Sequence, residues 1–452
     1  RGPAAAPSPW GRDVLMRLAA PARAFASRID DIRSDAALTL FGAALAIANV
    51  VTFVQWKFHN GVPLMIGRGR DSLCWPFWEG CQAYALPVRI VNAGLWLYLL
   101  LAVVAAGCFL ARRVTAGYWL LLLVNAMRVF VMLQDYRLKA NHHYMLNWMV
   151  LAYLFLPHTR AMLRHVLVCI YFWAGALKLD PDWLSGAALY SQDRLWFPRA
   201  LVPAACVYVV VLEMGVIWGL YSRRGWVFWG TLAQLALFHY TSWPIVGFWY
   251  PSLMLCLLSI LPLARAIPAP PPAETATPRR DRHVAYGVYA QTAAVAAIFA
   301  SLQMLPRAFP GDTAITGEGR MFALHMFDAL VQCDAALTYH RPDGDRVQVR
   351  KETTTLPHRS RCDPFVYYAI ARNECARLAE ESAASAAPVD FDVSLRSRRN
   401  SAAGYTQVLA VRNFCAATPR YALWHHNDWI GVPGDTGARA SGAPPALQTV
   451  RR

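Results

Sequence analysis

Charged residues are scarce in this chain of 452 residues, of which 16% are Asp, Glu, Lys or Arg, against about a quarter in soluble domains. The scarcity is concentrated before Pro306, where long apolar stretches dominate, and charge returns after it. We therefore expect a membrane domain followed by a domain exposed to water. Cys-x-x-Cys pairs and His-x-x-x-His spacings are also missing, which argues against a thiol oxidoreductase and against a metal site.

The first 35 residues lack an apolar core that ends in a small-residue cleavage site, so we expect no cleavable signal peptide there. The chain also has no visible internal repeat. Its net charge is +16, but many arginines stand in short segments between apolar runs, where they set the orientation of a membrane protein. This placement argues for membrane lipid as a partner and against nucleic acid.

Nine apolar runs before Pro306 approach the length of a membrane crossing, which needs about 20 residues. The fourth and seventh runs are short, which leaves a difference of one hairpin open. We expect an all-α polytopic bundle of about nine transmembrane helices with a small extracytoplasmic α+β domain. The predicted spans are about 36–56, 91–110, 118–133, 145–156, a fifth ending near 177, 201–220, 226–239, 245–263 and 284–305.

Lys and Arg collect on the cytoplasmic side of membrane proteins, which orients the predicted bundle. With the N-terminus inside, the arginine clusters at 112–113, 160–164, 223–224 and 279–282 all fall inside. The loops with CWPFWEGC, NHHY, KLDPDW and HYTSWP fall outside. We thus expect a cytoplasmic segment at 1–35, a membrane domain at 36–305 with a cytoplasmic Pro-rich linker at 268–283, an extracytoplasmic domain at 306–430 and a disordered tail at 431–452.

The ten cysteines divide between the two environments. Four lie in predicted spans, where a thiol is an ordinary small apolar group: Cys108, Cys169, Cys206 and Cys256. An even number in an oxidising compartment indicates disulfides, whose pairing the sequence leaves open. The six cysteines in segments expected outside are Cys74, Cys81, Cys333, Cys362, Cys375 and Cys415.

The tail from Pro306 has the pattern of a small mixed domain. Alternating apolar and polar residues predict strands near 347–349, 391–395 and 407–411. Asp363 at the N-cap and Pro364 in the first turn predict a helix between the first two strands.

Lys178 ends an otherwise apolar span. Ionisable side chains at membrane depth are costly and indicate function, yet a Lys near a helix end can also extend to water, and Asp180 or Asp182 could pair with it. Glu213 is the only carboxylate that we place well within a predicted span. Structural pairing and function are both open for it.

Two histidine segments lie toward the same predicted face as Lys178. In the first, residues 141–144 read Asn-His-His-Tyr, and adjacent helical residues point in different directions, so at most one histidine faces a given pocket. His239 in the other segment could also be a hydrogen-bonded histidine of the bundle. A few polar groups among tryptophans suit a flat apolar ligand such as a quinone, and burial would favour a neutral Lys178 amine that acts as a base. An interfacial aromatic belt is the alternative for the tryptophans.

Three segments, in this order, resemble the vitamin K-dependent γ-carboxylase family: NHHYMLNWMVLAYLFL, GALKLDPDWLSG and LFHYTSWPIVGFWYPSLML. They are similar to its Asn-His-Ser-Tyr-Leu, Gly-x-x-Lys-Leu-Asp-x-Asp-Trp-x-x-Gly and Phe-His-x-x-Asn-Ser-x-x-Phe-x-Ile-Gly-x-Phe segments. The resemblance covers about residues 36–263, the horizontally transferred transmembrane (HTTM) domain. The tail segment GEGRMFALHMFDA resembles bacterial members more weakly.

The resemblance implies an enzyme in a bacterial membrane that oxidises vitamin K hydroquinone or menaquinol with O2. The epoxide and strong base so formed would let CO2 add to glutamyl residues of an exported protein or peptide, in surroundings that exclude water. By resemblance, Lys178 deprotonates the quinol, His142 stabilises the carbanion and His239 belongs to the pocket. We expect no metal, and we expect quinol-binding roles for Asn141, Tyr144, Trp173, Asp180, Trp183 and Glu213.

The chain departs from the family pattern at several positions. Leu177 stands where the animal enzymes carry a second Lys, His143 where the family has Ser, and Thr241-Ser242 where it has Asn-Ser. The tail is also far shorter than the animal portion that binds a propeptide, so the quinol half of the reaction is better supported than carboxylation. The alternative is a non-carboxylating membrane protein that binds a quinone or lipid, or anchors the tail. A transporter is disfavoured because Glu213 is the only deeply placed acid that we identify.

Overall fold

The computed structural model describes residues 23–67, 72–78, 80–189, 195–270, 278–324, 331–340, 346–350, 360–382 and 390–432. Residues 1–22, the middle of the Pro-rich linker and nearly all of the tail expected to be disordered lie outside these ranges. The chain divides into two compact units. The first comprises Arg1–Met304 with Phe322–Phe327, and the second comprises Leu305–Met321 with Asp328–Arg452.

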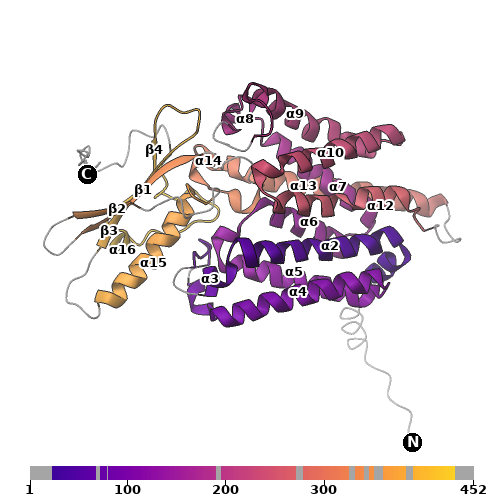
Figure 1. Ribbon diagram of the computed structural model, residues 1–452, viewed down its shortest axis with the longest axis horizontal. Helices are drawn as coiled ribbons and strands as arrows, with labels where there is room; N and C mark the ends of the chain where they lie inside the picture. The colour runs from indigo at the N-terminus through magenta and orange to yellow at the C-terminus, as the bar shows by residue number, and fades with distance from the viewer. Residues whose placement is uncertain are drawn as a thin grey trace, which may run out of the picture. The chain divides into compact units, whose positions relative to one another are not determined.

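The first unit is built of helices, most of them lying roughly alongside one another (Figure 1). The short helices α3 (Val62–Gly67) and α8 (Pro181–Leu184) follow α2 and α7. The longer helices are α2 (Ala36–Val54), α4 (Val88–Leu110), α5 (Val114–Gln134), α6 (Asn141–Phe155), α7 (Thr159–Ala176), α9 (Val202–Met214), α10 (Gly225–Val246), α11 (Trp249–Leu258), α12 (Ile260–Ala266) and α13 (Pro278–Met304).

Six helical stretches in the described residues are long and apolar enough to cross a membrane. They correspond to six of the nine predicted spans, and they support an integral membrane protein. The six are Ala36–His59, Val88–Leu110, Val114–Gln134, Arg199–Tyr221, Trp249–Ala266 and Tyr286–Ala308.

The other three predicted spans are helices, but their crossing of the membrane remains a prediction. The 15 residues of α6 rise by about 22 Å, less than the roughly 30 Å of a hydrocarbon core. Helix α7 carries Arg160, Arg164 and His165 in its first half, and α10 is interrupted by Gln234 and His239. Length and polarity thus explain why apolar runs alone do not settle the number of crossings.

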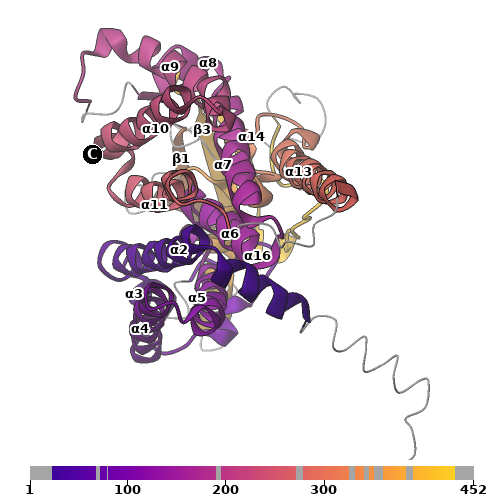
Figure 2. The same ribbon diagram turned by 90° about the vertical axis from the view of Figure 1, so that its right-hand side faces the viewer.

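Helix α2 occupies the centre of the first unit, where it contacts α4, α5, α6, α11 and α12 (Figure 2). Its start is fixed by Asp35, whose Oδ1 accepts hydrogen bonds from the amides of Ala37 at 2.9 Å and Leu38 at 3.1 Å. Arg160 of α7 donates to the same carboxylate, with Nη2 2.6 Å from Oδ1. The N-cap of α2 therefore also joins α2 to α7.

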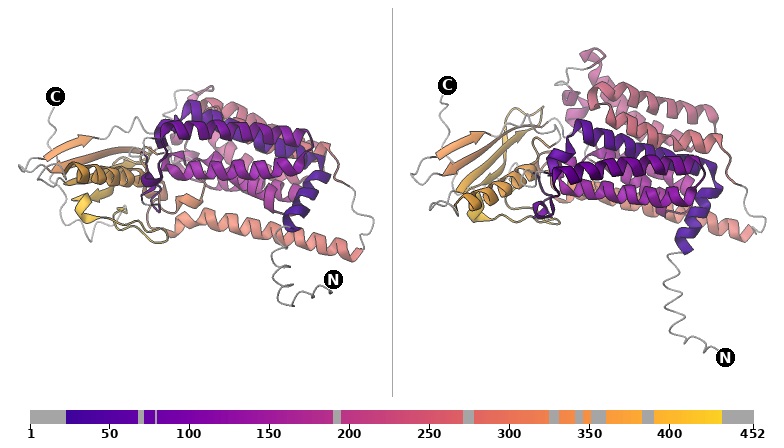
Figure 3. Two further views of the ribbon diagram at one scale, coloured as in Figure 1. Left: turned by 90° about the horizontal axis from the view of Figure 1, so that it is seen from below. Right: turned by 60° about the horizontal axis from the view of Figure 1, so that its bottom comes forward.

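The second unit contains an antiparallel sheet of four strands in the order β2-β1-β3-β4. The strands are β1 (Gln332–His340), β2 (Arg346–Arg350), β3 (Asp390–Arg398) and β4 (Thr406–Val411), and α15 (Pro364–Ser382) packs against the sheet (Figure 3). Phe391, Val393 and Leu395 alternate with polar residues and are buried beneath α15. The three predicted strands and the helix are confirmed, whereas β1 was not predicted.

Three disulfides join all six cysteines that were expected to pair. Cys74–Cys81 closes the loop between α3 and α4, Cys333–Cys362 joins β1 to the start of α15, and Cys375–Cys415 joins α15 to α16 (Phe414–Ala417). The four cysteines expected in spans are free thiols. The bonds fit an extracytoplasmic environment for these segments.

Candidate functional site

Lys178 and Glu213 form an ion pair inside the helical unit, with only 1% and 2% of their side chains exposed. Lys178 follows the last turn of α7 and also donates to the carbonyl of Ala174 at 3.1 Å, while Glu213 comes from α9. Gly175 allows this approach, because a Cβ there would lie 2.6 Å from Met214 and 3.0 Å from Glu213. Small size at position 175 thus lets α9 bring its carboxylate to the lysine.

The Asp-Pro-Asp-Trp turn after Lys178 covers the pair. Asp180 is the N-cap of α8 and accepts a hydrogen bond from the amide of Asp182 at 2.9 Å. The Trp183 indole donates to the carbonyl of Cys206 at 2.9 Å, and its ring centroid lies 5.9 Å from Lys178 Nζ. Asp180 therefore shapes the turn, and Trp183 places an aromatic face beside the ammonium.

His239 of α10 is fully buried beside the same pair. Its Nε2 is 2.6 Å from the hydroxyl of Tyr171 of α7, and its ring centroid is 5.7 Å from that of Tyr250 of α11. Tyr171 lies seven residues before Lys178, two helical turns along the same face, so this hydrogen bond connects His239 to the helix that leads to the lysine. Among the residues that the structure describes, His239 Nδ1 has no hydrogen-bond partner.

His142 reaches the cluster through Tyr250, since the two ring centroids are 6.5 Å apart. Its Nε2 is 2.8 Å from Oε1 of Gln55, which begins the π-helical turn Gln55–His59 at the end of α2. The neighbouring His143 has a different partner and accepts a hydrogen bond from the Trp56 indole at 3.0 Å. Single π-turns are frequent at functional sites, and this one supplies the partner of each histidine.

The structure does not bring all nine candidate residues together. The Tyr144 hydroxyl donates to the carbonyl of Phe322 at 2.8 Å and accepts from Gln303 of α13 at 3.1 Å. Trp173 packs on Phe172, with centroids 5.8 Å apart. Asn141 is buried at the first turn of α6. Tyr144 thus bonds to other neighbours, whereas Lys178, Glu213, Trp183, His239 and His142 define what we call the lysine cluster.

The sequence interpretation missed Tyr171, Tyr250 and Gln55. Tyr171 was accessible to it, because seven residues separate Tyr171 from Lys178 and two helical turns return to the same face. Tyr250 lies in the same quoted segment as His239 but was not singled out, and Gln55 comes from a helix far away in sequence, so no local pattern indicates it. The described residues hold no group of three or more His, Cys, Asp or Glu placed to bind a metal ion.

No family model, no curated protein and no solved structure matches this chain. The chemistry available to the lysine cluster follows from its own geometry. Burial penalises both charges, and transfer of a proton from the ammonium to the carboxylate would yield a neutral pair and so remove that penalty, at the expense of the Coulomb attraction between them. The amine of that neutral pair is a base inside an apolar site.

Proposed function

We propose that the chain is a γ-carboxylase-like membrane enzyme in which Lys178 deprotonates a reduced naphthoquinone such as vitamin K hydroquinone or menaquinol. The observation that carries the proposal is the buried Lys178–Glu213 pair, to which the buried His239 is linked through Tyr171 of α7. Buried ionisable groups that share a site with aromatic walls are typical of catalytic acid–base chemistry. The resemblance of the three segments points to the same residues.

The residues fit a quinol in one specific respect. His239 Nδ1 is a buried ring nitrogen with no partner among the described residues, and buried polar atoms of this kind are normally hydrogen-bonded. A quinol hydroxyl can donate or accept, so it suits either tautomer of His239. The rings of Tyr250 and Trp183 supply flat apolar surface close by.

In the proposed mechanism, Glu213 takes the ammonium proton and leaves Lys178 as the amine that receives the proton of a quinol hydroxyl. Tyr171 holds the His239 ring through Nε2 and leaves Nδ1 for the ligand. A bound quinol would supply, by its reaction with O2, the strong base that removes a γ-proton from a glutamyl residue before CO2 adds. His142 would stabilise the carbanion. Burial of all five side chains excludes the water that would quench such a base.

We further propose that the protein resides in a bacterial cell membrane with its N-terminus in the cytoplasm and its second unit outside. The arginine-rich segments between helices support this orientation. The three disulfides support an oxidising environment for the segments that carry them. The acceptor would then be a glutamyl residue of an exported protein or peptide.

The test is incubation of purified protein with vitamin K hydroquinone, O2, labelled CO2 and a glutamyl peptide. We expect epoxide formation in the wild type and its loss by a factor of at least about 100 in Lys178→Ala, in line with removal of a positioned base. Lys139→Ala is the matched control, because Lys139 lies in the same unit but bonds to the Tyr136 hydroxyl. Size-exclusion chromatography and a thermal melt verify that each variant is folded.

Three outcomes separate the candidate functions. Full turnover in a folded Lys178→Ala would exclude the catalytic role of this lysine. Epoxide without fixed CO2 would retain the quinol chemistry and overturn carboxylation. Neither product from the wild type would favour the second candidate, a non-carboxylating protein that binds a quinone or lipid in the apolar helical unit.

A further inference from the structure

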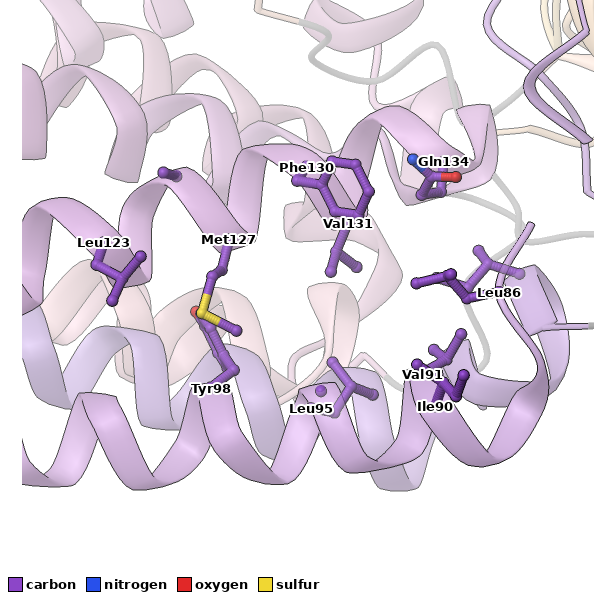
Figure 4. Close-up of a pocket in the computed structure, with 13 residues that line it drawn as sticks. Leu86, Ile90, Val91, Leu95, Tyr98, Leu123, Met127, Phe130, Val131 and Gln134 are labelled. Atoms are coloured by element: carbon purple, nitrogen blue, oxygen red, sulfur yellow. The ribbon is translucent and has the colours of Figure 1, made fainter. Parts of the chain in front are cut away.

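Helices α4 and α5 enclose a cavity of about 390 Å³ that lies apart from the lysine cluster. Its walls are apolar, with Val91 and Leu95 from α4 facing Met127 and Val131 from α5 (Figure 4). The volume falls within the range of about 300–1,000 Å³ that is usual for ligand pockets. None of the described residues that line it is charged.

Gln134 supplies a polar group at one end of the cavity (Figure 4). Only 6% of this residue is exposed, and within the described part of the chain its Nε2 has no hydrogen-bond partner. The hydroxyl of Tyr98, the other polar group of the lining, already donates to Asn49 at 2.7 Å. The amide of Gln134 is therefore a buried donor left for a ligand, since such groups are normally satisfied.

The position of Gln134 along α5 sets its depth in a membrane. The 21 residues of α5 rise by about 31 Å, close to the roughly 30 Å of a hydrocarbon core. Gln134 is the last residue of this helix, and Val88 begins α4 near the same end, so both lie at the boundary between hydrocarbon and headgroups. The ester carbonyls of membrane lipids lie at that boundary.

The cavity opens on the outer surface of α4 and α5, which faces lipid in a membrane. Ile90, Leu123 and Phe130 line it and are about half exposed, as residues that face acyl chains are. Gln134 and Leu123 lie eleven residues apart on one helix, so the lining extends for about 16 Å along the membrane normal. This elongated apolar shape suits a chain that lies parallel to the helices.

We propose that this cavity binds one acyl chain of a glycerolipid, whose ester carbonyl accepts a hydrogen bond from Gln134 Nε2. Burial of the chain supplies the affinity, and the amide selects for the carbonyl. The uncharged lining disfavours a free fatty acid, whose carboxylate would meet no cation among the described lining residues.

The test reconstitutes the full chain in nanodiscs made from equal amounts of a diester phospholipid and its diether analogue with the same chains. After transfer to detergent, native mass spectrometry measures the lipid that stays bound. We expect one retained lipid, enriched in the diester by roughly three- to tenfold, as one net hydrogen bond provides. Gln134→Met keeps a similar volume without the donor, so it should bind both lipids equally.

Gly94→Leu tests the cavity itself. A Cβ at Gly94 meets nothing within 4 Å, so a leucine there extends into the space that Gly94 lines and should abolish retention. Gly107→Leu is the matched control, because Gly107 is on α4, also has nothing within 4 Å and does not line the cavity. Unchanged retention in a folded Gly94→Leu would overturn the site. An unchanged diester preference in Gln134→Met would overturn the role of the amide.

Discussion

At the scale of single residues, the buried charge of Lys178 is stable only beside the opposite charge of Glu213, and the reverse also holds. Both charges are almost completely removed from solvent, which costs several kcal/mol per ion in real proteins. Their mutual attraction and the carbonyl of Ala174 offset that cost. The pair therefore contributes little net stability, but either charge alone would be strongly destabilising.

We expect Glu213→Leu to lower the free energy of unfolding by about 3–5 kcal/mol, because it leaves the buried ammonium uncompensated. The double variant Lys178→Met with Glu213→Leu should recover most of this loss, since two apolar side chains of similar volume replace the pair. Thermal unfolding in detergent, monitored by tryptophan fluorescence, measures the stability of the single variant and of the double variant. A double variant no more stable than Glu213→Leu would refute this coupling.

At the scale of elements, Asp312 and Arg399 join α14 (Thr313–Thr316) to the end of β3. Asp312 is the N-cap of α14, with its Oδ1 2.9 Å from the amide of Ala314, and Arg399 Nη2 lies 2.7 Å from that oxygen. Burial would raise the pKa of Asp312, but the hydrogen bonds and charge of Arg399 outweigh burial and hold the pKa below its ordinary value of 3.8.

Because the pKa of Asp312 is lower in the folded state than in the unfolded state, the contact stabilises the fold fully at pH values above the unfolded-state pKa. This stabilisation is lost as the pH falls through the folded-state pKa. We expect Asp312→Asn to cost about 1 kcal/mol at pH 7, where the carboxylate is charged, and to cost progressively less as the pH falls through the folded pKa of Asp312. Hydrogen–deuterium exchange in the full chain measures this cost as a change in the protection of peptides that cover α14 and β3, after correction for intrinsic exchange rates.

The exposed pair between Asp334 and Arg396 provides the control for that measurement. Exposed ion pairs contribute about 0–1 kcal/mol, so Asp334→Asn should leave protection nearly unchanged. If the wild type and Asp312→Asn lost the same amount of exchange protection between pH 7 and pH 3, the charged Asp312 carboxylate would not be the group that stabilises α14 and β3.

Elements with strong local signals were predictable from the sequence. Asp363-Pro364 predicted α15, where Asp363 accepts a hydrogen bond from the amide of Phe365 at 3.0 Å. Strand β1 was not predictable in this way, because it is an inner strand of the sheet whose burial does not alternate strictly. Its pairing with β3 depends on residues 50 to 66 positions away. Long-range pairing of this kind has no local signature.

The candidate site, too, was predictable from the sequence only in part. Lys178 and Glu213 were identified because charge is rare in apolar helices. Their contact depends on the small size of Gly175, a role in packing that the quoted signature does not reveal. Tyr144 was a candidate because it belongs to the Asn-His-His-Tyr segment. Its hydroxyl, however, bonds to Phe322 and Gln303. A sequence motif identifies a turn of helix, and packing decides which of its side chains face the site.

At the scale of the whole molecule, the distribution of arginine and of disulfides predicts a single orientation in the membrane. The six cysteines that form disulfides and the four free thiols occupy different segments. The proposed chemistry needs this separation, because an exported acceptor would meet the enzyme outside the cytoplasm. Orientation is therefore a property that the function requires and that can be measured independently of activity.

Two exposed positions test the orientation. Ser401 lies in the turn after β3, and Arg223 lies in the segment between α9 and α10. In spheroplasts of a bacterial host, we expect a membrane-impermeant maleimide to label Ser401→Cys and to spare Arg223→Cys until the membrane is permeabilised. The wild type should be labelled only after reduction of its disulfides, because its free thiols lie within helices. Labelling of Arg223→Cys in sealed spheroplasts, with Ser401→Cys protected, would reverse the orientation and exclude carboxylation of exported proteins.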